Sequence, residues 1–108
     1  MNFSEYQKAV MITSGPAITK KEAIVLSALG ICGEGGEVAD LIKKHLFHCH
    51  DLPTNKLQEE LGDVLWYIAR MCNALNLSME HVALMNIFKL KKRYPNGFSS
   101  ERSINREE

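Results

Sequence analysis

The sequence predicts an all-α protein in which four helices form a bundle within one domain. Apolar residues recur every three or four positions along four stretches, which is the period of a helix packed on one side. No β-hairpin pattern of alternating strands around a tight turn is present. Polar capping residues and turns containing glycine or proline separate the stretches. The expected helices span about residues 2–13, 20–46, 55–75 and 79–93.

The start of the second helix is marked by two signals. Ser14-Gly15-Pro16 is a sequence that breaks helices, so the first helix is expected to end there. Thr19 and Glu22 have the spacing of a capping box, in which each side chain bonds the backbone N–H of the other residue. The second helix is therefore expected to begin at this box and to continue to about Leu46.

Two further caps predict the remaining helices. Thr54, after the turn at Pro53, is expected to cap the third helix, and Ser78 is expected to cap the fourth. The fourth helix is apolar almost all round, which is typical of a helix buried on several sides. In so short a chain a second copy would supply that cover, so a homodimer or homotetramer is expected. A domain spanning 1–97 is followed by a polar tail, 98–108, expected to be disordered or laid across a partner.

Composition excludes several classes of protein. The chain has 108 residues, enough for one modest core, and its 13 basic residues balance 13 acidic ones. This balance leaves no basic excess for binding a nucleic acid polymer, and no apolar run approaches the length of a membrane span. The N-terminus lacks the basic and apolar regions of a signal peptide. Cys32, Cys49 and Cys72 are expected to be reduced thiols of a cytoplasmic protein, with Cys32 and Cys72 packed in the core.

Two pairs of acids are the main candidates for chemistry. Glu34 and Glu37 lie three residues apart, and Glu60 and Asp63 repeat that spacing in the third helix. At this spacing the acids of a pair share one helix face, which here lies at the edge of the apolar sector. Clustered carboxylates either take up protons or bind a cation, and oxygen ligands favour Mg²⁺, Mn²⁺ or Ca²⁺ over zinc. The competing interpretation is that these acids are solvated charges that never meet.

Four glycines within seven residues surround the first acid pair: Gly30, Gly33, Gly35 and Gly36. Each costs about 1 kcal/mol relative to alanine inside a helix. Together the four glycines cost roughly 3–4 kcal/mol, which is a large share of the stability of a small domain. The glycines therefore predict that another group approaches the backbone closely at this stretch.

The segment 45–50, which reads HLFHCH, contains three histidines and a cysteine. Both residue types bind zinc, but no second pair of ligands stands elsewhere in the chain at a usual spacing. A helix end that frays into a loop is the favoured interpretation, because histidines are stabilised near the negative end of a helix dipole.

Two further polar features have two interpretations each. Asn86, Lys89 and Arg93 form a polar stripe on the apolar fourth helix, which either lines a site or reflects the preference for basic residues at a helix C-terminus. Lys44 lies on nearly the same helix face as Glu37, about 10 Å further along. It is either a contact for the phosphates of a substrate or a solvated lysine.

Three segments together carry a family resemblance. They are Gly33-Glu34-Gly35-Gly36-Glu37-Val38-Ala39-Asp40, Glu59-Glu60-Leu61-Gly62-Asp63-Val64-Leu65-Trp66-Tyr67 and the stretch from Asn86-Ile87-Phe88-Lys89-Leu90 to Arg93-Tyr94-Pro95. The chain resembles a MazG-like nucleotide pyrophosphohydrolase of the all-α NTP pyrophosphatase superfamily, whose hallmark is E-x-x-E, a variable spacer and E-x-x-D. The resemblance covers roughly residues 3–98.

This resemblance implies Mg²⁺-dependent hydrolysis of a nucleoside triphosphate to a monophosphate and pyrophosphate, by a dimer or a higher oligomer. It implies that Glu34, Glu37, Glu60 and Asp63 are the metal ligands and the catalytic acids, with one or two metal ions. Either Glu34 or Glu37 orients or deprotonates the attacking water.

The resemblance also implies substrate contacts. Tyr67, one turn after Asp63, would line the nucleotide pocket, and Asn86 and Lys89 would contact phosphates or sugar. Two rival functions remain. A non-catalytic, metal-dependent nucleotide-binding or interaction module would use the same acids without releasing pyrophosphate. A di-iron carboxylate bundle is disfavoured, because it needs Glu-x-x-His motifs, and neither Glu37 nor Asp63 is a histidine.

Overall fold

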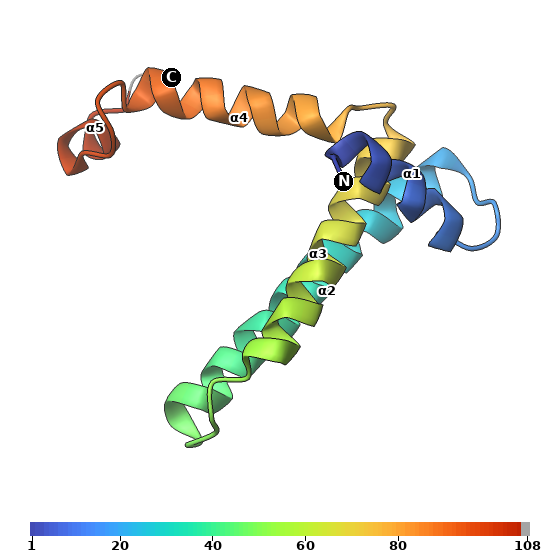
Figure 1. The fold of residues 1–108 in the computed structure, drawn as a ribbon, viewed down its shortest axis with the longest axis horizontal. Helices are drawn as coiled ribbons and strands as arrows, with labels where there is room; N and C mark the ends of the chain where they lie inside the picture. The colour runs from blue at the N-terminus through green and yellow to red at the C-terminus, as the bar shows by residue number, and fades with distance from the viewer. Residues whose placement is uncertain (107–108) are drawn as a thin grey trace.

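The computed structural model describes residues 1–106, which form helices and no strand. The helices are α1 (Phe3–Thr13), α2 (Lys20–Phe47), α3 (Thr54–Ala74), α4 (Met79–Arg93) and α5 (Ser100–Ile104). α2 and α3 lie side by side as a long antiparallel hairpin (Figure 1). The predicted all-α class and its four main helices are confirmed. No helix in the described part of the chain combines the length and apolarity that crossing a membrane requires.

The fully buried core is small and lies where α1 crosses the end of α3. It contains Val10 of α1, Ala69 and Cys72 of α3, and Met79 at the start of α4. Cys72 therefore packs in the core, as predicted. The same prediction is wrong for Cys32, which is exposed on α2.

Gln7 joins three helices at this core. Its side-chain amide donates to Oδ1 of Asn73 (3.0 Å) and to the carbonyl of Leu77 (2.9 Å). Its own carbonyl oxygen Oε1 accepts the backbone N–H of Met79 (2.8 Å). Asn73 in turn donates to the backbone carbonyl of Gln7 (3.1 Å). These bonds fix α1 against the turn between α3 and α4.

α4 leaves this junction and runs away from the hairpin (Figure 1), contacting α1. Large apolar side chains along it are between 36% and 58% exposed: Val82, Leu84, Met85, Ile87, Phe88 and Leu90. The four main helices therefore do not close into a compact bundle within one chain. The burial on several sides expected for the fourth helix is not provided by its own protomer.

Capping signals place most helix starts correctly. Thr19 and Glu22 form the expected capping box, with bonds of 3.1 and 3.0 Å. Ser78 accepts the N–H of His81 (3.2 Å) at the start of α4, also as expected. The cap predicted at Thr54 is wrong. Pro53 occupies the cap position without a side-chain bond, and Thr54 is already the first helical residue.

The described part of the tail is folded against its own chain. The guanidinium of Arg102 in α5 donates to the backbone carbonyls of Arg93 and Lys92 at the end of α4. Disorder, one of the two expectations for the tail, does not describe α5, and the other, an arm laid across a partner, stays a prediction. Residues 107–108 lie outside the described residues.

Candidate functional site

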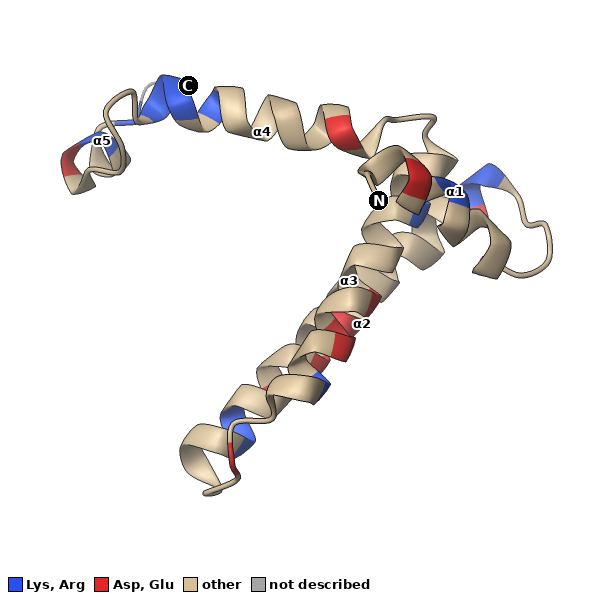
Figure 2. Cartoon of the chain, viewed as in Figure 1, with Lys and Arg blue, Asp and Glu red and all other residues tan. Residues whose placement is uncertain are grey.

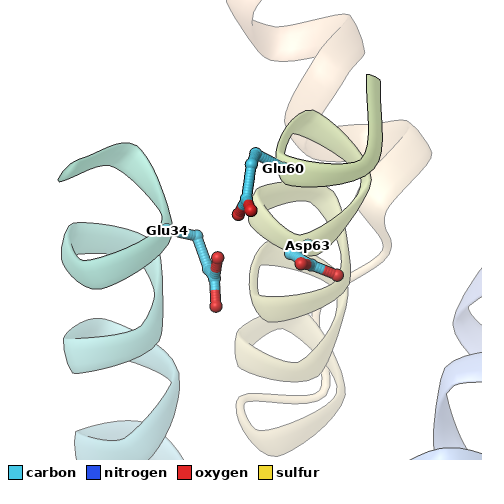
Figure 3. A group of neighbouring side chains, drawn as sticks. All are labelled: Glu34, Glu60 and Asp63. Carbon is cyan, nitrogen blue, oxygen red and sulfur yellow. The ribbon is translucent and has the colours of Figure 1, made fainter. Parts of the chain in front are cut away.

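Three carboxylates from two helices meet along the hairpin (Figure 3). Glu34 extends from α2, while Glu60 and Asp63 extend from α3. One ligand oxygen of each lies within 4.8 Å of those of the other two. Glu34 and Glu60 are half-buried between the helices, and Asp63 is exposed beside them. The structure thus brings together three of the four acids that the sequence singled out.

Electrostatics at this group favour proton uptake. The pKa of Glu60 is raised above its ordinary value, first by a hydrogen bond with the carboxyl group of Glu34. Loss of hydration and repulsion by Glu34, Asp63 and Glu59 raise it further. Without a cation, Glu60 therefore takes up a proton more readily than an ordinary glutamate. A bound cation would relieve the same repulsion, because both a proton and a cation compensate carboxylate charge.

Glu37, the fourth acid, lies outside this group. It follows Glu34 by one turn of α2 and is exposed. Lys44, interpreted either as a phosphate contact or as a solvated lysine, pairs with Asp40, whose Oδ2 lies 2.9 Å from its Nζ. This hydrogen bond is the main cause of the raised pKa of Lys44, and the charge of Glu37 is a lesser one. Lys43 also approaches Asp40, at 3.1 Å. This pairing was not predicted, because the spacing argument for Lys44 considered only Glu37.

Tyr67 is held close to the acids by a tight contact between the two helices. A Cβ atom at Gly30 of α2 would overlap the ring of Tyr67, so the ring occupies the space that a side chain would take. The Trp66 and Tyr67 rings meet edge-on, with centroids 5.0 Å apart and planes at 88°. The indole N–H of Trp66 donates to Oγ1 of Thr13 (2.8 Å). Tyr67 is thereby fixed one turn after Asp63.

The contact with Tyr67 accounts for only one of the four clustered glycines, Gly30. A Cβ at Gly33, Gly35 or Gly36 would meet open space. α2 nevertheless continues as a helix through all four. Within the described part of one protomer, therefore, Gly30 is the only one of these four glycines that another group approaches closely, as predicted.

The polar stripe on α4 lies apart from the acids. Asn86 and Lys89 are exposed and line an open hollow on α4. The guanidinium of Arg93 lies 6.0 Å from the ring centroid of Tyr94. Figure 2 shows the basic end of α4 far from the acidic middle of the hairpin. Within one chain, the structure does not bring the stripe to the carboxylates.

Tyr6 is a further titratable residue influenced by an acid of the group. Tyr6 of α1 has a raised pKa because it is partly buried, and the charge of Asp63 adds to this effect. With Phe3 and Leu65 it lines a hollow of ≈ 350 Å³. Apolar spacing in α1 predicts that Tyr6 faces the core, and the structure packs it there.

The fold and the site define an all-α protein with a carboxylate cluster between two antiparallel helices. Residues 25–98 match the MazG nucleotide pyrophosphohydrolase domain, and the chain belongs to this family. It is 36% identical over 80 residues to the Gene 37 protein of Mycobacterium phage L5, with 70% of each chain covered. No solved structure gives a significant match. The family resemblance is thus confirmed, and the domain boundary at residue 97 stays a prediction.

Gly30→Ala is expected to destabilise the hairpin, because the new methyl group overlaps the ring of Tyr67. Overpacking of this kind costs about 1–3 kcal/mol, measured by urea unfolding at fixed protein concentration. Gly36→Ala is the matched control, since its site is open and alanine favours a helix by about 1 kcal/mol. Equal stability changes in the two variants would contradict the contact.

Proposed function

We propose that this protein is a Mg²⁺-dependent nucleoside triphosphate pyrophosphohydrolase. It cleaves an NTP or dNTP to the monophosphate and pyrophosphate, and Mn²⁺ is expected to substitute for Mg²⁺. The observation that carries the proposal is the meeting of Glu34, Glu60 and Asp63 in a chain of the MazG family.

The residues present suit a hard divalent cation. The group offers only carboxylate oxygens, all within 4.8 Å of one another, and such ligands select Mg²⁺ or Mn²⁺ over zinc. The pKa of Glu60 is raised by a hydrogen bond with Glu34, by loss of hydration and by nearby negative charge, and this supports the binding of a compensating cation. Glu37, one turn beyond Glu34, is the proposed fourth ligand.

The chemistry follows from the positions of these side chains. A bound Mg²⁺ would neutralise charge on the triphosphate and lower the pKa of a coordinated water. Glu34 or Glu37 accepts a hydrogen bond from the attacking water and orients it for displacement. Tyr67, fixed by Gly30 and Trp66, positions the nucleoside beside the carboxylates.

A homodimer or homotetramer is part of the proposal. The apolar side chains of α4 need cover, and so does an exposed strip of α2 formed by Val25, Leu26 and Leu29 (49%, 42% and 67% exposed). A second copy whose α4 lies against this hairpin would bury both surfaces. It would also deliver Asn86 and Lys89 toward a triphosphate held at the acids of the first copy. One assembly thereby supplies both the missing apolar cover and the missing positive charge.

Asp63→Ala is expected to reduce pyrophosphate release by about 100-fold or more, the scale of losing one preorganised electrostatic contact. The assay is a panel of NTPs and dNTPs with and without Mg²⁺. Glu5→Gln is the control, because it removes an exposed carboxylate from α1, outside the group. Turnover at the wild-type rate by Asp63→Ala would refute the assignment. Nucleotide binding by the wild type without pyrophosphate release would indicate the non-catalytic module.

The free energy of unfolding of the metal-free protein is expected to fall as pH rises. Because the folded-state pKa of Glu60 is raised, its contribution is full below the ordinary glutamate pKa and is lost as pH rises through the raised value. Glu60→Gln should remove this loss, so the Tm difference between wild type and variant isolates it. At neutral pH, Mg²⁺ at 100 times its Kd should add about 2.7 kcal/mol to wild-type stability. A wild-type curve parallel to that of Glu60→Gln would argue against the repulsion.

Phe88→Glu is expected to convert the oligomer into monomers, because it places a charge on an apolar helix that needs cover. Phe88 is 58% exposed in the single chain. Light scattering coupled to gel filtration measures the mass, and Lys8→Gln, which changes the net charge by the same amount at an exposed position of α1, is the control. A monomeric wild-type protein with full activity would rule out the shared site.

A further inference from the structure

Arg70 is a buried cation that the acid site does not use. It lies on α3 and is 7% exposed. Its Nη1 donates to the backbone carbonyl of Ser14 (2.7 Å), and its guanidinium carbon lies 5.4 Å from the ring centroid of Trp66. Its Nε is buried and has no hydrogen-bond partner. A guanidinium carries five N–H donors, so one carbonyl leaves most of its donor capacity unused.

No carboxylate compensates this charge. Among residues 1–106 the ion pairs join Lys43 and Lys44 to Asp40, and Arg70 takes part in none. A buried charge without an opposite charge is strongly unfavourable, because it loses hydration without regaining it from a partner. The Trp66 ring and the Ser14 carbonyl offset part of that loss, and they bring no negative charge.

Arg70 lines a pocket of ≈ 240 Å³ at the loop between α1 and α2. The loop contributes Ser14 and Gly15, and Asn73 on the next turn of α3 lies beside Arg70. Among the residues lining the pocket, Arg70 carries the only charge, and no acid opposes an incoming anion. Gly15 has a φ of 78°, a left-handed conformation that glycine adopts without strain.

We propose that Arg70 and the loop following α1 bind a phosphoryl oxyanion. Arginine is the side chain best suited to such a group, since its planar donors match two oxygens at once. The site is separate from the carboxylates. Arg70 follows Asp63 by seven residues on the same side of α3, about 10 Å further along the helix. The anion arrives either as free phosphate or as the terminal phosphate of a bound nucleotide.

Phosphate binding to the metal-free protein tests the site independently of hydrolysis. In wild type, titration with inorganic phosphate in EDTA is expected to shift the NMR signals of the Arg70 Nε–H and the Gly15 amide. Arg70→Gln is expected to weaken binding at least tenfold by calorimetry. Lys8→Gln, which removes an exposed charge from α1, is expected to bind as wild type does. Asp63→Ala should keep phosphate binding, so a failed hydrolase assignment would leave this result standing.

A second arm identifies the source of the anion. If phosphate alone leaves the spectra unchanged, a methylene-bridged nucleoside triphosphate with Mg²⁺ is titrated next. Loss of affinity in Arg70→Gln would then assign the site to the terminal phosphate of a nucleotide. Arg70→Lys keeps the charge and serves where Arg70→Gln fails to fold, with reduced affinity again expected. The inference is overturned if neither probe moves the Arg70 and Gly15 signals, or if the folded Arg70 variants bind both probes as tightly as Lys8→Gln.

Discussion

Repulsion among carboxylates held between α2 and α3 is the constraint on which the site depends. Helix packing brings Glu34, Glu60 and Asp63 together, and their charges oppose that packing. The pKa of Glu60 is raised by a hydrogen bond with Glu34, by loss of hydration and by this repulsion. The helices approach closely because α2 presents small residues to α3. Ser27 is fully buried with its hydroxyl bonded to its own helix at Ala23, and Gly30 accommodates an aromatic ring. Packing energy thus maintains an arrangement that a cation or a proton stabilises.

Much of the fold was predictable because its signals are local. Caps such as Thr19 and Ser78 act within one helical turn, so their spacing alone located the starts of α2 and α4. The acid pairs were predictable for the same reason. The direction of α4 was not, because it depends on hydrogen bonds from Gln7 to residues about 70 positions away. Arg70 escaped notice because periodicity does not show whether a buried cation has a partner.

The extended shape of the protomer links stability to function. Only a few side chains are fully buried in the described part of the chain, while α4 leaves a row of apolar groups exposed. Burial of apolar surface is the main favourable term in folding, so an assembly that covers α4 would stabilise the fold. In the proposed homo-oligomer this same contact brings polar residues of α4 to the carboxylates. Stability and substrate binding would then depend on one interface.

The central claim is that Glu34, Glu60 and Asp63 meet in order to hold a divalent cation. Anomalous diffraction from crystals of the wild-type protein soaked in Mn²⁺ tests it directly, because the signal locates the ion without assuming its ligands. A peak is expected between α2 and α3, within coordination distance of these three carboxylates. Mn²⁺ bound elsewhere, with the three side chains turned apart into solvent, would contradict it.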